Sequence, residues 1–252
     1  MKLVANIFGS SLGKKYVMAI SGVVLFLFVI GHLVGNLQVF LGPEAINRYG
    51  HFLQSNLELI WPVRIILLTL IALHIWAAFK LSRENKAARP ITYGELKPAG
   101  ASYASRTMLM SGLIVFAFIM YHLLHFTVQV KYINLTGRDF VSFVDVIDPA
   151  KPRHDIFQMM VVGFSSWMVS AFYLVGIALL CLHLSHGASS MFQSLGFKNK
   201  YYGPILDKSA RVIALLIFIG YMSIPAAILA GYGRDYVKKK AETPVIVPGG
   251  AH

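Results

Sequence analysis

Charged side chains are scarce in this chain: Asp, Glu, Lys and Arg make up 13% of its 252 residues, whereas hydrophobic residues make up 56%. A typical soluble domain is about 25% charged. The chain has too little polar surface to face water, so its composition excludes a soluble globular domain and predicts an integral membrane protein. It also has only one cysteine, Cys181, which excludes an internal disulfide.

The net charge of +12 is compatible with nucleic-acid binding, but the basic residues lie between long apolar blocks and form no single stripe. Such spacing is typical of loops at an anionic membrane surface. With the N-terminus inside, 13 of the 23 Lys and Arg residues lie on the cytoplasmic side, six of them in the 80–106 loop. The positive-inside rule therefore predicts a cytoplasmic N-terminus and an external C-terminus.

Long windows without charge locate the membrane spans. They cover residues 16–43, 107–130, 156–197 and 212–233. A shorter window follows Arg64, and it reaches spanning length if its helix begins near Leu59 with Pro62 in the first turn. About 20 residues cross the hydrocarbon core, and lipid cannot satisfy open backbone groups. The sequence predicts an all-α integral membrane protein with five transmembrane helices, at about 16–41, 59–80, 107–130, 159–186 and 211–232.

The remaining segments carry weaker signals. Residues 1–236 form one membrane domain, and residues 237–252 are predicted to be a disordered C-terminal tail. No internal repeat is evident. The uncharged segment after His186 is predicted to lie at the surface, and the loop around 132–153 has no readable role.

Six histidines lie within or at the ends of four predicted helices, where an ionisable side chain is costly and therefore a functional candidate. They are His32, His74, His122, His125, His183 and His186. His32 and His122 each lie about 23 Å along their helices from the cytoplasmic end, at 1.5 Å per residue. His74 and His183 lie close to the inner face. The sequence therefore predicts two pairs at two levels, about 10–15 Å apart along the membrane normal.

Two histidines from different helices at one depth favour haem iron, which needs two axial ligands. Zinc needs three or four ligands and proton relays usually include carboxylates, but no predicted span contains Asp or Glu. Small residues such as Gly31, Gly35 and Gly187 leave room for a flat macrocycle. Depth favours His122 over His125 and His183 over His186, although residues three apart share a helix face and both alternatives stay open.

These residues resemble a known family, the five-helix, two-haem cytochrome b anchor of succinate:quinone oxidoreductases (succinate dehydrogenase and fumarate reductase). The resemblance covers about residues 10–235, and no single motif in it is strong. The matching residues are Ser21-Gly22, Gly31-His32-Leu33, Tyr49-Gly50-His51-Phe52, Ala72-Leu73-His74, Tyr121-His122 and Leu182-His183-Leu184-Ser185. In that family the first four helices form a haem-binding four-helix bundle in which helix I pairs with III and helix II with IV.

The resemblance implies two haems b, with His32 and His122 holding the outer haem and His74 and His183 the inner one. It also implies a quinone, with a low-potential quinone such as menaquinone expected. The partners would be a flavoprotein subunit and an iron–sulfur subunit on the cytoplasmic face of a bacterial inner membrane. The chain itself would be the electron-transfer and quinone-binding subunit of the enzyme and would bind no dicarboxylate.

Position alone indicates further candidates. Quinone contacts are expected in the first outer loop and the start of the second helix, from Arg48, Tyr49, His51, Gln54 and Glu58, with Asn47 in the same cluster. Haem propionate contacts are expected from Arg64, Arg106, Lys208 and Arg211.

Two other interpretations account for parts of the pattern. One is a diheme cytochrome b anchor of another respiratory oxidoreductase, of the hydrogenase or formate dehydrogenase type. The other is a haem-free membrane transporter, for which Pro225 in the fifth helix would serve as a hinge.

Overall fold

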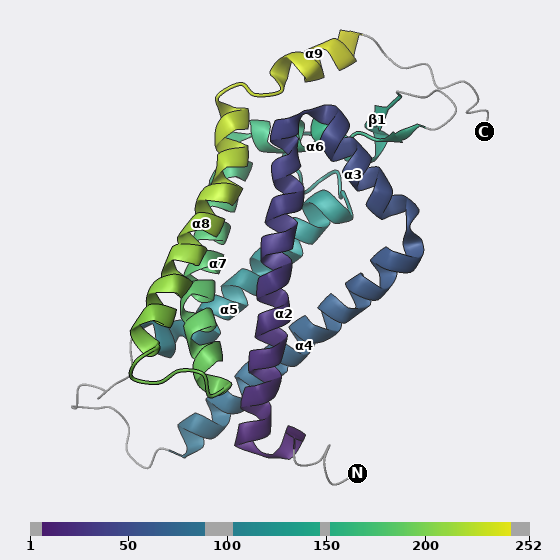
Figure 1. The fold of residues 1–252 in the computed structure, drawn as a ribbon. Coiled ribbons are helices and arrows are strands. Elements are labelled where there is room, and N and C mark those ends of the chain that lie inside the picture. The colour runs from purple at the N-terminus through teal and green to yellow at the C-terminus, as the bar shows by residue number, and fades with distance from the viewer. Residues whose placement is uncertain (1–6, 89–102, 147–151, 243–252) are drawn as a thin grey trace. The chain divides into compact units, whose positions relative to one another are not determined.

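The computed structural model describes residues 7–88, 103–146 and 152–242, and it confirms the predicted fold class (Figure 1). Five helices are long and apolar enough to cross a membrane, so the chain is an all-α, multi-pass integral membrane protein. These helices are α2 (Ser11–Leu37, extended by the 3-10 turn Gln38–Leu41), α4 (Leu57–Ala87), α5 (Tyr103–His122, extended by the π-helical turn Leu123–Thr127), α7 (Trp167–Ser194) and α8 (Gly203–Leu229).

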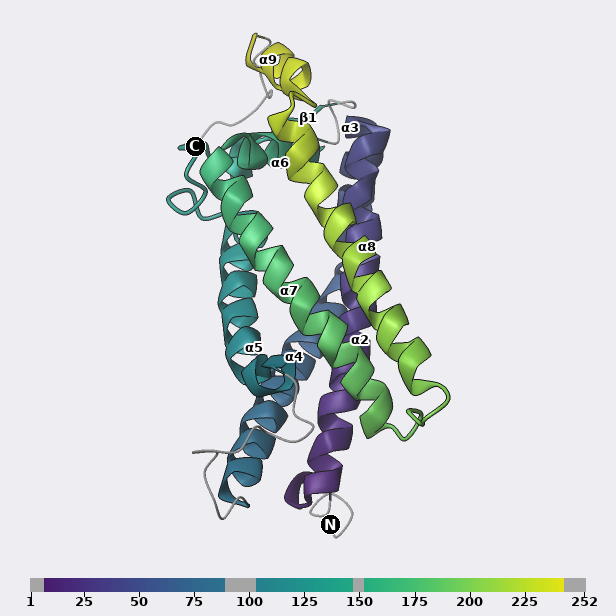
Figure 2. The same cartoon turned by 90° about the vertical axis from the view of Figure 1, so that its left-hand side faces the viewer.

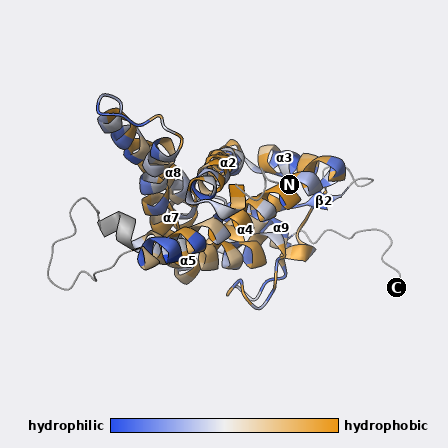
Figure 3. Ribbon diagram, turned by 90° about the horizontal axis from the view of Figure 1, so that it is seen from below, coloured by the Kyte–Doolittle hydropathy of each residue, from blue (hydrophilic) through white to orange (hydrophobic). Residues whose placement is uncertain are grey.

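Large apolar side chains lie on the outer surfaces of these helices. Leu27, Val34 and Leu68 are each about 60% exposed, and Figure 3 shows apolar residues along α2 and α4. In water such a surface would aggregate, whereas in a bilayer it faces lipid. The apolar residues that a soluble protein would bury therefore serve here as the contact with the membrane.

The shorter elements gather at one end of α8, as Figures 1 and 2 agree. They are α3 (Pro43–Ser55), the 3-10 turn Phe140–Ser142, strands β1 (Val144–Asp145) and β2 (Arg153–His154), α6 (Ile156–Ser165) and α9 (Arg234–Glu242). The two strands are antiparallel, with Val144 opposite His154. Helix α9 corrects the predicted disordered tail as far as Glu242, and residues 243–252 lie outside the described residues.

The predicted fourth span, 159–186, is wrong in its boundaries. The chain forms two helices there, α6 and α7, because Ser166 is extended (φ −76°, ψ 118°) and interrupts the helical backbone. Ser170 Oγ donates to the carbonyl of Phe164, six residues back, at 2.8 Å, a bond that a continuous helix would not make. Helix α7 is consequently the fourth span, and it runs on through the segment that was predicted to lie at the surface.

The chain divides into two compact units, and each of the five long helices contributes to both. The first unit comprises Met1–Gly31, Trp61–Phe116 and Ala178–Phe218, and it contains His74 and His183. The second comprises His32–Ile60, Ala117–Ile177 and Ile219–His252, and it contains His32 and His122. The two histidine pairs therefore belong to different units.

Candidate functional site

His74 and His183 face one another in the first unit, as their depths predicted. Their ring centroids are 6.5 Å apart and the ring planes meet at 66°. His74 lies thirteen residues before the end of α4 at Ala87, and His183 lies eleven residues before the end of α7 at Ser194. The two imidazoles thus come from two different spans and meet at matched distances from the helix ends.

Nδ1 of His74 is held by α2. It lies 3.1 Å from the carbonyl oxygen of Met18 and 3.1 Å from Oγ of Ser21. A carbonyl only accepts, so Nδ1 must carry the proton and donate it. The other ring nitrogen, Nε2, then carries the lone pair, which is the form of histidine that ligates a metal.

Nδ1 of His183 is held by α5 in a similar way. It lies 3.3 Å from Oγ of Ser111, and that hydroxyl donates its single proton to the carbonyl of Met108 at 3.0 Å. We assign the hydroxyl proton to the shorter contact, the one to Met108, so that the serine oxygen accepts from Nδ1 and Nε2 of His183 keeps its lone pair.

Two glycines lie against these rings. A Cβ on Gly22 would lie 3.4 Å from Cε1 of His74, and a Cβ on Gly112 would lie 3.3 Å from Cε1 of His183. By contrast, a Cβ on Gly31 or Gly187 would meet nothing within 4 Å. The glycines beside the histidines in sequence are thus not the ones that lie against the rings.

The inner pair fits an axially ligated iron. Metal–imidazole bonds of about 2.0–2.1 Å on both sides put the nitrogens about 4 Å apart and the ring centres roughly 6 Å apart. The observed 6.5 Å between the centroids of His74 and His183 is close to that spacing. With both Nδ1 atoms engaged, the remaining Nε2 atoms are the ones that would bind.

His32 and His122 also meet, in the second unit. Their centroids are 5.7 Å apart and the planes meet at 80°. The amide of Asn36 lies 3.3 Å from Nε2 of His32 and donates to the His32 carbonyl at 2.7 Å. Iron bound at Nε2 of His32 would displace the Asn36 amide from that nitrogen.

Tyr173 connects His122 to His125. Its hydroxyl lies 3.3 Å from Nδ1 of His122 and 3.0 Å from Nδ1 of His125. His125 is fully buried within the π-helical turn and packs against Phe126, with centroids 4.0 Å apart, and Phe140. Its Nε2 has no hydrogen-bond partner among the described residues. His122 therefore faces His32, whereas His125 points into an aromatic cluster.

His186, unlike His183, contacts a residue of its own helix. It lies three residues further along α7, where its Nε2 is 3.3 Å from Oγ of Ser190 on the same helix. Ser21, Ser111 and Tyr173 were not predicted as histidine partners, although the Ser-Gly dipeptides at 21–22 and 111–112 are visible in the sequence.

The basic residues expected near propionates lie mostly at the surface. Arg64 is exposed and stacks over Trp61 at 5.3 Å, and Lys208 and Arg211 are exposed on α8. Arg106 falls on α5, but its side chain lies outside what is described. Lys198 was not among the predicted propionate contacts. In the first unit it donates to Asp207 at 2.6 Å and to Ser189 at 2.9 Å.

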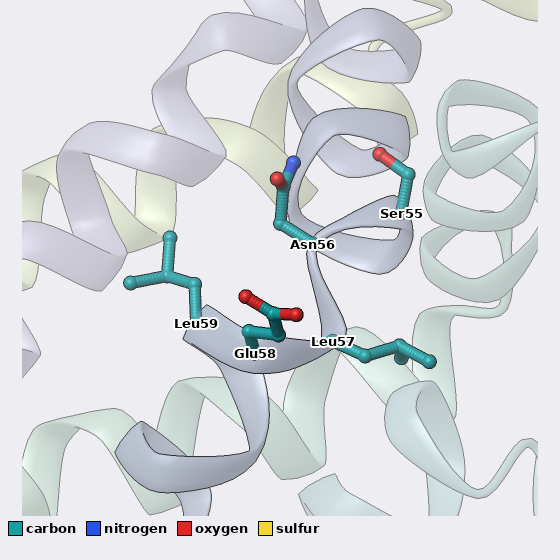
Figure 4. Close-up of a pocket in the computed structure, with 5 residues that line it drawn as sticks. All are labelled: Ser55, Asn56, Leu57, Glu58 and Leu59. Atoms are coloured by element: carbon teal, nitrogen blue, oxygen red, sulfur yellow. The ribbon is translucent and has the colours of Figure 1, made fainter.

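The expected quinone residues lie on α3 and the first turn of α4. Arg48, His51, Gln54 and Glu58 are exposed, and the ring of Tyr49 packs so closely on Gly35 that a Cβ there would lie 2.9 Å from its hydroxyl. A pocket of about 610 Å³ opens where α3 meets α4. It is lined by Ser55, Asn56, Leu57, Glu58 and Leu59, and Figure 4 shows the Glu58 carboxylate between the two leucines.

Asn47 is not part of that surface, because it is fully buried in a polar network of the second unit. Its amide donates to Asp145 and Asp155 at 3.0 Å each, and its oxygen accepts from the backbone of Phe157 at 2.9 Å. Arg153 donates to Asp145 at 2.9 Å and forms an ion pair with Glu44. The loop whose role the sequence left unreadable thus supplies Asp145 and Arg153 to this network and ends next to Asp155, which caps α6.

Helix α9 joins the same network. Lys240 lies 3.2 Å from Asp145 and 3.3 Å from Asp155, and the Tyr236 hydroxyl donates to Asp155 at 2.8 Å. Burial raises the pKa of the Asp145 carboxyl, but hydrogen bonds from Asn47, Arg153 and Lys240 outweigh burial and hold the pKa below its ordinary value. Burial and the bond to Asp155 raise the pKa of Tyr236. The network therefore attaches α9 through charged groups.

Within residues 7–88, 103–146 and 152–242, no group of three or more His, Cys, Asp and Glu side chains gathers in a way that could hold a metal ion. The histidines meet as pairs. No family model, curated protein or solved structure matches the chain.

Proposed function

We propose that this chain is the diheme cytochrome b membrane anchor of a succinate:quinone oxidoreductase. The observation that carries the proposal is the facing pair His74 and His183, which come from two spans and hold their Nδ1 atoms on neighbouring helices. A second pair, His32 and His122, supports a second haem. The family resemblance of the sequence supplies the identity of the enzyme.

When bound, each haem supplies an iron that accepts and donates one electron, at a potential tuned by its axial ligands and their hydrogen bonds. The chain's own residues would hold and insulate that iron. His74 and His183 would ligate the inner iron through Nε2, and Met18, Ser21 and Ser111 would fix the orientation of the two rings. The surrounding spans would keep water from the site.

The quinone would bind at the end of the second unit that carries α3. Quinone reduction consumes protons, so its site needs hydrogen-bonding and proton-carrying groups. The exposed Glu58, beside the pocket at the start of α4, and the nearby His51 and Gln54 are such groups. A low-potential quinone such as menaquinone is the proposed substrate.

The chain would lie in a bacterial inner membrane with its N-terminus in the cytoplasm. A flavoprotein and an iron–sulfur subunit would dock on the cytoplasmic face, where the basic 80–106 loop lies. Most of that loop, residues 89–102, lies outside the described residues.

Purification from membranes in a mild detergent tests the proposal. We expect the chain to co-purify with two soluble subunits and with succinate–quinone reductase activity. Recovery with hydrogenase or formate dehydrogenase subunits would instead support the rival respiratory anchor. A colourless protein without soluble partners would contradict any electron-transfer role.

A further inference from the structure

The first and third spans share a Ser-Gly pattern, and the structure shows what it contacts. Ser21-Gly22 on α2 stands eleven residues before His32, and Ser111-Gly112 on α5 stands eleven residues before His122. In both helices the Ser-Gly dipeptide belongs to the first compact unit and the following histidine to the second. Each helix thus carries the same two features at the same spacing.

Each dipeptide contacts the histidine of the next span in the chain. Ser21 on α2 contacts His74 on α4, and Ser111 on α5 contacts His183 on α7. The glycine that follows each serine lies against the same ring, so that an added Cβ would lie within 3.4 Å of Cε1. The two halves of the inner pair are therefore built in the same way, one from α2 with α4 and the other from α5 with α7.

The hydroxyl protons decide the direction of these contacts. Ser21 Oγ donates to the Val17 carbonyl at 2.7 Å, and Ser111 Oγ donates to the Met108 carbonyl at 3.0 Å. Each serine has one proton, and we assign it to its shorter contact, the one to a carbonyl of its own helix, so that its lone pairs accept from the imidazole Nδ1. An acceptor at Nδ1 fixes the ring and increases the basicity of Nε2.

The two halves differ in one respect. Nδ1 of His74 has a second acceptor, the Met18 carbonyl at 3.1 Å. Among the described residues, Ser111 is the acceptor that contacts Nδ1 of His183. His183 should therefore depend on its serine more than His74 does.

We infer that Ser21 and Ser111 are positioning residues that orient the two inner histidines and set the potential of the iron they hold. Gly22 and Gly112 lie against the two rings. The inference rests on the proposed function, because it concerns the same inner pair.

Alanine and threonine variants of both serines test it. The readouts are haem content per chain and a redox titration that resolves the two haems. Loss of an Nδ1 acceptor makes the imidazole less basic, which stabilises ferric iron less and raises the potential. For Ser111→Ala we expect about a tenfold change in the reduction equilibrium of the inner haem, equal to 59 mV for one electron. A smaller rise is expected for Ser21→Ala, and the outer haem should keep its potential.

Two controls separate positioning from general damage. Ser111→Thr keeps the hydroxyl and should restore the potential. Ser223→Ala removes a serine that donates to its own helix, at 2.7 Å from the Gly220 carbonyl, and should leave both potentials unchanged.

Unchanged inner potentials in both alanine variants would overturn the inference, and so would equal shifts of both haems. A wild-type protein without haem would instead defeat the proposed function. The two failures are distinguishable, since the first requires that the wild type contains both haems.

Discussion

At the residue scale, hydrogen bonds separate the candidate ligands from the neighbouring histidines. His183 meets His74 across two spans, whereas His186 contacts Ser190 on its own helix. Similarly, His122 meets His32, whereas His125 is enclosed by aromatic rings. The ligand choices that depth favoured are thus also the choices that face another histidine.

His74→Ala and His183→Ala should each remove the inner haem, because an axial position would be empty. His186→Ala should leave haem content unchanged and serves as the matched control. A pyridine haemochrome assay on each purified variant checks this, with one haem per chain expected for the first two variants and two for the third. Loss of a haem in His186→Ala, with both retained in His183→Ala, would reverse the assignment on α7.

On α5, His122→Ala should remove the outer haem and His125→Leu should keep it. His125 has a fully buried Nε2 without a described partner, so an apolar side chain of similar size removes an unsatisfied group. Visible spectra of the reduced variants report which haem is lost. An outer haem that survives His122→Ala but disappears in His125→Leu would show that His125 is the ligand.

The sequence indicated the histidines but not their partners. A serine that donates to its own helix is common in apolar helices, and nothing in the sequence marks its lone pair as directed at a ring. Which glycine contacts a ring likewise depends on where the helices pack. Gly187, close to His183 in sequence, faces open space, while Gly112 on another helix contacts the ring.

At the scale of elements, the polar network explains how α9 and the loop before α6 acquire structure. Asp155 is fully buried and caps α6 by accepting from the backbone of Gln158 at 2.9 Å, while it also binds Asn47 and Tyr236. No role for this loop could be read from the sequence, because its Asp145 pairs not only with the nearby Arg153 but also with Lys240, far away in the chain.

Lys240→Met should destabilise the second unit by about 1–3 kcal/mol, because it leaves the buried carboxylates short of a donor. Lys238→Met changes an exposed lysine of the same helix and should stay within about 0.5 kcal/mol of the wild type. Thermal unfolding in detergent measures both. Equal melting temperatures for the two variants would mean that Lys240 does not hold α9.

Acid should weaken the same network. The pKa of Asp145 is depressed in the folded protein, so its contribution to stability is present above the unfolded pKa of about 3.9 and is lost as the pH falls through the folded pKa. We therefore expect the melting temperature to fall below about pH 4. Asp145→Asn should show a flatter pH dependence in this range. A wild-type curve no steeper than that of the variant would contradict the assignment.

The break between α6 and α7 is a helix boundary that the sequence pattern did not predict. The uncharged window from Ile156 to Phe197 gave no boundary, since Ser165 and Ser166 are unremarkable in an apolar helix. The break lies at Ser166, where the backbone is extended, and the bond from Ser170 to the Phe164 carbonyl spans it; no sequence pattern marks either feature. Charge-free windows located the first, third and fifth spans, and the second was found by extending a shorter window back across Arg64, because lipid imposes length and polarity directly.

At the scale of the whole molecule, five spans place α3, which follows the first span, and α9, which follows the fifth, on the same side of the membrane. The elements after the first, third and fifth spans are α3, the β1–β2 hairpin with α6, and α9, and all of them belong to the second compact unit. Alternating spans place these three connections on one side, as their shared polar network requires. The sequence predicted this alternation from the span count alone.

The central claim is that the two histidine pairs each hold one haem. The most direct test is the haem content of the purified wild-type chain, by pyridine haemochrome assay together with the spectrum of the reduced protein. We expect two low-spin haems b per chain, because two facing pairs provide two bis-histidine sites. A value near zero or near one haem per chain, in protein extracted directly from intact membranes, would contradict the assignment of one haem to each pair.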